Sequence, residues 1–185
     1  MFLVDSHCHL DLLDLKPYAG DLNQAIQQAY AEGVKHILNV SVSIKTFPLL
    51  LATAKKYPFV SASVGLHPNE TEEETSAEEL CALAADEKVV AIGETGLDYY
   101  RSTGEVEWQR KRFREHILTA QKTERPLIVH SRQAKEDTLK LLREEQSKGV
   151  RGVLHCFTED WEMASQALDL GFYISFSGIV TFRNA

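Results

Sequence analysis

The sequence has few cysteines and no long hydrophobic segment. Its three cysteines, Cys8, Cys81 and Cys156, are an odd number without a CxxC pair. They therefore predict no disulfide framework, and a reducing cytoplasm is the expected location. No apolar run approaches the roughly 20 residues that span a bilayer, so no membrane association is expected. Met1 leads directly into three apolar residues without a basic region, which argues against a secretory signal.

Positive charge is also scarce. The chain has 20 Lys and Arg residues against 27 Asp and Glu, for a net charge of −7. This balance argues against broad electrostatic capture of nucleic acid, which normally uses a basic stripe. It leaves open a phosphate substrate held by bound metal cations, because those ions are large local charges. We therefore expect any contact with nucleic acid to be local, and the sequence indicates no particular protein partner.

The 185 residues are 44% apolar, enough to fill the core of one domain. No break in composition marks a linker, so residues 1–185 are expected to form a single domain. Short apolar runs alternate with helical patterns along its length, which predicts a parallel sheet buried on both faces. The runs that predict strands are Phe2–Val4, Ile37–Leu38, Phe59–Val60, Val89–Ile92, Leu127–Val129, Val153–Leu154 and Phe172–Ile174.

The helical patterns leave two architectures open. Residues 22–30 follow a helical stripe that ends before Gly33, and the longest candidate helix covers residues 105–123. A doubly wound sheet and a TIM (β/α)₈ barrel both fit this alternation. The first turn after a strand has no G-x-G-x-x-G, and ligand-type residues follow many strands, which favours the barrel. Because a barrel takes about 250 residues, we expect an incomplete one that lacks the last βα unit.

Four of the predicted strand ends carry residues that bind metals. His7 and His9 follow the first run, and residues two apart in a strand point to the same side. The other candidates are Glu94 in "AIGETGLDYY", His130 in "LIVHSR" and His155 in "VLHCF". Strand ends of a barrel meet at its catalytic mouth, so these five side chains together predict a metal site.

The ligand set indicates the kind of metal. Imidazole and carboxylate suit zinc, manganese, iron or nickel, and carboxylate-rich sites also accept magnesium. Five ligands are too many for one catalytic ion that keeps an open position. They suit two divalent ions, with Glu94 central enough in the strand order to bridge them. Two ions about 3.5–4 Å apart activate a water and stabilise a leaving oxygen, which is hydrolytic chemistry.

Six segments resemble the TatD family of metal-dependent hydrolases, with the closest likeness to its bacterial YcfH-type members. They are "DSHCHLD", "GLHP", "GETGLDYY", "VHSR", "LHCF" and "GFYISFSGIVTFRNA", and the resemblance covers the whole chain. It implies a TIM barrel, a two-metal centre and magnesium-dependent deoxyribonuclease activity. It also implies that His7, His9 and Glu94 hold one metal, and that Glu94, His130 and His155 hold the other.

The family pattern includes one further ligand. An aspartate after the eighth strand, in a motif similar to "ETDSP", binds metal and is the expected general base. The present sequence has no such motif. Five of the six ligands that the resemblance implies are therefore present, with Glu94 as the catalytic bridging residue. The absence of the sixth leaves the activity of this chain open.

Basic residues near these motifs are candidates for phosphate contacts. His67 in "GLHP" ends a strand and is a candidate to bind a substrate phosphate, although a structural role beside Pro68 fits as well. Arg132 follows His130 by two residues, so it is predicted on the same side. Arg101 and Arg183 are weaker candidates, because a solvated arginine is the default for each.

Acidic and aromatic residues near the motifs receive other predictions. Asp5 and Asp11 are candidates to orient His7 and His9 through hydrogen bonds. The glutamate-rich run at 70–74 predicts a solvated loop before a helix near residue 76. Trp108, Phe113 and Ile117 lie on one helical face, which is predicted to belong to the core.

Three functional hypotheses follow. The first is a two-metal phosphodiesterase acting on DNA, including single-stranded DNA or 3′–5′ exonuclease action. The second is hydrolysis of an amide or ester, such as an aminoacyl-tRNA. Related barrels with that chemistry often bridge their metals with a carboxylated lysine. The fourth strand offers Glu94 and has no lysine beyond Lys88 at its start, which favours the nuclease-type centre. The third is an inactive fragment or binding module, since a missing eighth strand leaves two open sheet edges.

Overall fold

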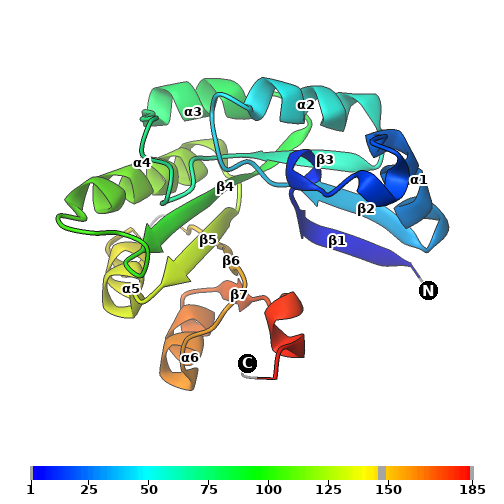
Figure 1. The fold of residues 1–185 in the computed structure, drawn as a ribbon. Coiled ribbons are helices and arrows are strands. Elements are labelled where there is room, and N and C mark those ends of the chain that lie inside the picture. Colours follow the sequence, from blue (N-terminus) through cyan, green and yellow to red (C-terminus); the bar gives the residue numbers. More distant parts are fainter. Residues whose placement is uncertain (1, 146–148, 184–185) are drawn as a thin grey trace.

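The computed structural model describes residues 2–145 and 149–183. Seven strands form one sheet, in which each strand pairs in parallel with the next along the chain. Figure 1 shows that this sheet is strongly curved, with both ends of the chain on its open side. The strands are β1 (Leu3–Cys8), β2 (Val34–Asn39), β3 (Val60–Val64), β4 (Val89–Asp98), β5 (Leu127–Arg132), β6 (Gly152–Leu154) and β7 (Phe172–Ile174).

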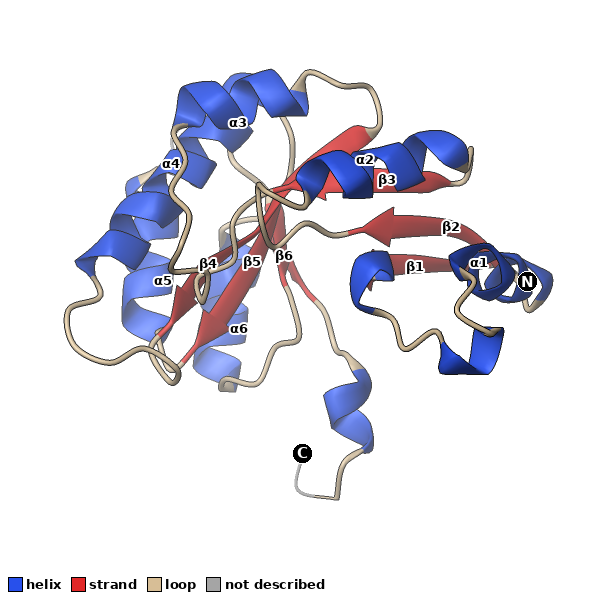
Figure 2. Ribbon diagram, turned by 45° about the horizontal axis from the view of Figure 1, so that its top comes forward, coloured by secondary structure: helices blue, strands red, loops and turns tan. Residues whose placement is uncertain are grey.

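Helices cover the outer side of the curved sheet (Figure 2). Several begin at a residue whose side chain accepts a backbone N–H: Asp21, Ser76 and Asp160 cap three of them. The helices are α1 (Leu22–Ala31), α2 (Phe47–Lys56), α3 (Ala77–Ala84), α4 (Glu107–Thr123), α5 (Lys135–Glu144) and α6 (Trp161–Asp169). In the described residues, no helix is long and apolar enough to cross a membrane.

The core lies between the sheet and these helices. Phe113 and Ile117 of α4 are fully buried, as are Val60 and Val64 of β3. All five residues of β3 are buried, as expected for a strand covered on both faces. The apolar runs therefore predicted the strands correctly, and the longest helix begins two residues later than expected.

The strand order decides between the two architectures. A doubly wound sheet reverses its strand order at a switch point, whereas here the order follows the sequence throughout. Curvature with sequential parallel order is the arrangement of a (β/α) barrel. Among the described residues, β1 pairs with β2 alone and β7 with β6 alone, so the sheet forms a half-barrel with two edges.

Candidate metal centre

The end of β1 and the middle of β4 bring two histidines next to one carboxylate oxygen. His7 Nε2 lies 3.2 Å from Glu94 Oε2, and His9 Nε2 lies 3.6 Å from the same oxygen. The two Nε2 atoms are 3.2 Å apart. His7 on β1 and His9 just after it thus have their imidazoles on one side, as the sequence predicted.

The other oxygen of Glu94 serves a second cluster. His67 Nε2, just after β3, lies 3.6 Å from Glu94 Oε1, and His130 Nδ1 on β5 lies 3.2 Å from it. In each cluster the three possible ligand atoms lie within 4.8 Å of one another. Glu94 is shared by the two clusters and offers one oxygen to each.

The residues of both clusters fit a divalent cation. Two ligands at about 2.0–2.1 Å from a tetrahedral ion are roughly 3.4 Å apart. The separation of 3.2 Å between His7 Nε2 and His9 Nε2 is close to that value. Two nitrogens directed at one carboxylate oxygen are also a donor set that Zn²⁺ and Mn²⁺ accept.

Electrostatics keep the ligands in their metal-binding forms. Burial raises the pKa of Glu94, but hydrogen bonds from His130 and His7 outweigh it and hold that pKa well below its usual range. Burial lowers the pKa of His67 to about 4, against the opposing effect of Glu94. At neutral pH Glu94 is therefore ionised and His67 is neutral, as ligands must be.

His155 follows β6 and lies outside both clusters. Its ring stacks on that of His7, with centroids 3.3 Å apart and planes 6° apart. Its Nδ1 lies 3.3 Å from Ser175 Oγ. Burial, followed by the charge of His7, lowers the pKa of His155 to about 4. His155 therefore lies beside the first cluster, while His67 supplies the second.

Two glycines allow β4 to carry Glu94 into this position. Gly93 and Gly96 have φ angles of +131° and +136°, in the region that L side chains rarely adopt. A Cβ on Gly96 would collide with the carbonyl oxygen of His130, and one on Gly93 would lie 2.5 Å from that of Ile128. The "GETG" motif thus combines the ligand with the close approach of β4 to β5.

A cavity of about 500 Å³ contains the centre, and two arginines line it. Glu94, His67 and His130 contribute to its lining together with Arg101 and Arg132. The Arg132 guanidinium lies 3.9 Å from the ring centroid of Tyr100. Among the described residues, no carboxylate lies within ion-pair distance of Arg101 or Arg132. Both cations are therefore available to an anion in the cavity.

Comparison with known proteins supports the assignment that this geometry suggests. The family model described as TatD related DNase matches residues 4–185. The chain belongs to the TatD family. It is 48% identical to the uncharacterized metal-dependent hydrolase YcfH of Escherichia coli K12, over all of this chain and 70% of that protein. The corresponding hydrolase YabD of Bacillus subtilis is 39% identical over 99% of this chain and 71% of its own.

A solved structure confirms the fold of this TatD-family chain. The crystal structure of YjjV, a TatD homologue from Escherichia coli, superposes with a TM-score of 0.88 at 30% identity. The match covers 99% of this chain and 71% of YjjV. The predicted family and the α/β barrel fold are confirmed. By family the chain is a metal-dependent hydrolase, and it has two His/Glu clusters that could each hold a metal ion.

Sequence reasoning missed Asp98, which contacts a ligand of this TatD-family centre. His130 Nε2 lies 3.2 Å from Asp98 Oδ2, and Asn69 donates its amide to the same oxygen. Arg101 donates its backbone N–H to Asp98 Oδ1. Asp98 is buried and four residues after Glu94 on β4. That even spacing was the available signal, because it predicts the same side of the strand.

The predicted orienting aspartates have other contacts. Asp5 accepts the backbone N–H of His7. His9 Nδ1 lies 2.9 Å from the carbonyl oxygen of Val40, which fixes its ring. For Asp11, no contact with either histidine ring occurs among the described residues. The backbone carbonyl of Val40, the residue after β2, thus orients His9, a role that the sequence predicted for a carboxylate.

The loop at 70–74 is not simply solvated, and the core prediction is confirmed for Phe113 and Ile117 but wrong for Trp108. Glu73 accepts hydrogen bonds from Ser43 and from two backbone N–H groups, and Glu74 forms an ion pair with buried Arg112. Trp108 is half-buried and lines a cavity. Arg183 is exposed and lies outside the lining of the metal cavity as described.

Proposed function

We propose that this chain carries the metal centre of a two-metal phosphodiesterase that cleaves DNA in the cytoplasm. The main observation behind this proposal is that Glu94 presents one oxygen to each of two histidine clusters. The family description as related DNases supports the substrate class. The three cysteines are unpaired, which favours a reducing compartment.

The proposed ligands of the two cations lie on or just after β1, β3, β4 and β5 of the half-barrel. His7, His9 and Glu94 would hold one cation, and Glu94, His130 and His67 would hold the other, while His155 stacks on His7 beside the first cluster. Two divalent ions, Mg²⁺, Mn²⁺, Zn²⁺ or Ni²⁺, supply an activated water and neutralise charge on the phosphate when bound. Asp98 orients His130 through the contact at Nε2, so the ring keeps Nδ1 directed at Glu94.

The arginines of the cavity give the site its preference for a phosphate. The Arg132 guanidinium lies over the ring of Tyr100. Arg101 is fixed through its backbone N–H, which donates a hydrogen bond to the Asp98 carboxylate. A guanidinium binds phosphate oxygens through paired N–H groups. In a chain of net charge −7, two unpaired cations at one cavity provide the local contact that a DNA strand needs.

Lys88 argues against the amidohydrolase-type alternative, in which a carboxylated lysine bridges the metals. The ammonium of Lys88 donates to the carbonyl oxygens of Tyr57, Pro58 and Val60. It is thus engaged at the beginning of β4, at the opposite end of the strand from the clusters. An ester substrate such as aminoacyl-tRNA, and a binding module without turnover, become outcomes of the test below.

The test incubates labelled single-stranded DNA with the protein and Mg²⁺ or Mn²⁺, beside a Glu94→Gln variant. We expect metal-dependent shortening of the strand that falls at least 100-fold in the variant. An aminoacyl-tRNA and a carboxylic ester serve as competing substrates. Faster cleavage of either ester than of DNA would overturn the nuclease proposal. Binding of DNA without cleavage under all metals would leave a binding module.

A further inference from the structure

A second cavity lies directly beside the metal centre. It measures about 560 Å³, within the range of about 300–1,000 Å³ typical of small-molecule sites. Its walls come from the loop at 68–74 and from the segment that leads into α4. Asn69 and Arg101 line both this cavity and the metal cavity. One ligand can therefore extend from the metal centre into the second cavity.

Arg112 of α4 holds the loop wall of this cavity in place. Its side chain is 2% exposed and donates to the backbone carbonyls of His67, Glu70 and Glu73. It also forms an ion pair of 2.8 Å with Glu74. Four contacts from one guanidinium fix the loop without a ligand, so the cavity is already formed.

An aromatic ring lines this fixed cavity. Trp108 is half-buried, and its ring centroid lies 4.7 Å from the Arg112 guanidinium. The indole is thus held by a cation–π contact beside an open volume instead of packing in the core. A planar apolar surface at a cavity wall is the feature on which heterocyclic rings stack.

The polar groups of the cavity suit the edge of a neutral heterocycle. Asn69 donates its Nδ2 to Asp98, which leaves Oδ1 as an acceptor. Among the described residues, the hydroxyls of Thr71 and Thr103 make no hydrogen bond, and each can donate or accept. Glu74 is neutralised by Arg112, so Arg101 at the boundary is the unpaired charge. This distribution favours a neutral ring inside and an anion at the boundary.

We propose that this second cavity is a nucleobase subsite. This cavity holds the unpaired base of a nucleotide whose phosphate lies in the metal cavity. Arg101, at the boundary between the two cavities, contacts that phosphate. The proposal rests on the proposed function and adds to it the place where an unpaired base of the strand is held. Stacking on an aromatic side chain accepts any base, so little sequence preference is expected.

Binding of dAMP to the full chain tests the subsite without relying on turnover. The protein has two tryptophans, and a Trp161→Phe background leaves Trp108 as the single indole reporter. We expect dAMP to quench Trp108 fluorescence saturably, with and without Mg²⁺, because the base stacks beside the ring. Deoxyribose 5-phosphate and inorganic phosphate, which lack a base, are expected to leave the emission unchanged. Equal quenching by dAMP and deoxyribose 5-phosphate would overturn the subsite.

A variant that fills the cavity gives an independent readout. Thr71→Phe changes an exposed loop residue that lines the cavity, so the fold is expected to persist. It should raise the apparent Kd for dAMP at least tenfold. Thr53→Phe on α2, outside both cavities, is the matched control and should leave the Kd unchanged. An unchanged Kd in Thr71→Phe would contradict the proposal.

The two proposals fail in different ways. DNA cleavage without quenching by dAMP removes the subsite and leaves the phosphodiesterase. Quenching by dAMP without cleavage of any DNA removes the phosphodiesterase and leaves a nucleotide-binding site. An increase in KM for single-stranded DNA in Thr71→Phe, with unchanged cleavage of a strand whose terminal nucleotide is abasic, supports both.

Discussion

At the scale of the residue, the centre depends on how Glu94 is kept ionised inside the protein. The residue is 4% exposed, and burial alone would favour its neutral form. Hydrogen bonds from His130 and His7 reverse that effect and lower its pKa. In the absence of cations, these ligands therefore hold one another close to the arrangement that a metal requires.

Gly96 offers a direct test of the close approach beside Glu94. Gly96→Ala should destabilise the protein by about 2 kcal/mol or more, because its φ of +136° is strained and its Cβ meets the His130 carbonyl. Gly104→Ala is the control, since Gly104 has a φ of +82° but open space around it. Urea unfolding measures both. Equal losses of stability would show that strain alone, and not the contact with β5, sets the requirement.

Arg132 is expected to act on substrate binding. Arg132→Met keeps the apolar stem beside Tyr100 and removes the charge that faces the cavity. We predict an increase in KM for single-stranded DNA of about tenfold, equivalent to about 1.4 kcal/mol, with a smaller change in kcat. Steady-state kinetics at two salt concentrations checks this. An unchanged KM would place the phosphate elsewhere.

Some of these residue roles could be predicted from the sequence and others could not. His7, His9, Glu94 and His130 follow apolar runs in a parallel sheet, and topology alone brings such positions together. Whether His67 or His155 belongs to the second cluster depends on how each imidazole ring is turned relative to Glu94. Strand-end position does not determine that, since both residues follow strands.

At the scale of the element, α4 supports the strand-end segment that carries His67. His116 is fully buried, and its Nε2 accepts the backbone N–H of Leu66 while Nδ1 donates to the Arg112 carbonyl. Both bonds need the neutral ring with its proton on Nδ1. Burial lowers the pKa of His116 to about 4, which agrees with that form.

Stability is therefore expected to fall on mild acidification. A pKa of about 4 in the folded state lies below the unfolded value near 6.5, so the unfolded chain binds the proton more tightly. The contribution of His116 is complete above about pH 6.5 and is lost as the pH falls toward 4. At pH 5 the loss is about 2 kcal/mol. His67 and His155 act in the same direction.

The His116→Gln variant isolates this contribution. Gln can still accept the Leu66 N–H, but it does not titrate. Urea unfolding at pH 7.5 and pH 5.0 should show a smaller drop in the free energy of unfolding for the variant than for the wild type, by about 2 kcal/mol. Parallel drops in the two proteins would exclude His116 as a source of the acid sensitivity.

The periodicity of α4 predicted the helix but not its role. Phe113 and Ile117 lie on the apolar stripe and are buried, as that pattern requires. Arg112 is also buried, because loop carbonyls surround its guanidinium. A charged residue in a helical pattern indicates the solvated face, so this contact with a distant loop was not predictable from spacing.

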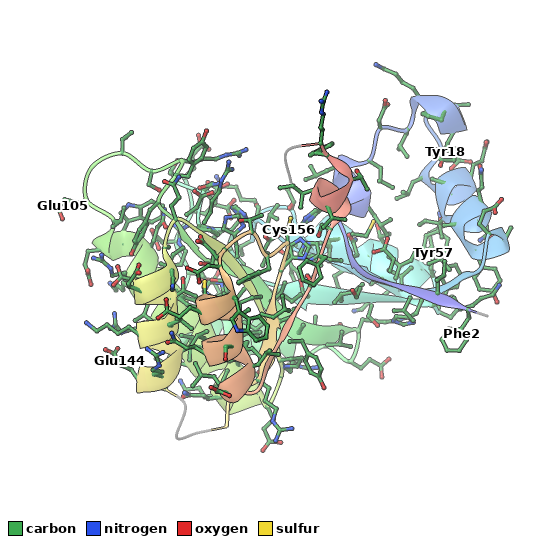
Figure 3. All side chains as sticks on the ribbon, turned by 90° about the horizontal axis from the view of Figure 1, so that it is seen from below. Phe2, Tyr18, Tyr57, Glu105, Glu144 and Cys156 are labelled. Carbon is green, nitrogen blue, oxygen red and sulfur yellow. The ribbon has the colours of Figure 1, made fainter. Side chains whose placement is uncertain are left out.

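At the scale of the whole molecule, the chain is a curved half-barrel that spans about 70% of its relatives. The edge strands β1 and β7 expose apolar side chains, including Leu3, Val4 and Tyr173. Figure 3 shows Phe2 at the periphery of the molecule, while Cys156, next to His155 in the sequence, lies nearer its centre. The two clusters form within these seven strands, and Glu94 on the central strand joins them.

The most direct test of the shared carboxylate is the number of Mn²⁺ ions bound per chain, measured by electron paramagnetic resonance. The wild type should bind two ions, and Glu94→Gln should bind both at least tenfold more weakly, because each cluster loses its carboxylate oxygen. Asp11→Asn, which changes an exposed acidic residue outside both clusters, should bind like the wild type. Binding of two ions by Glu94→Gln with wild-type affinity would contradict the assignment of Glu94 as the bridging ligand.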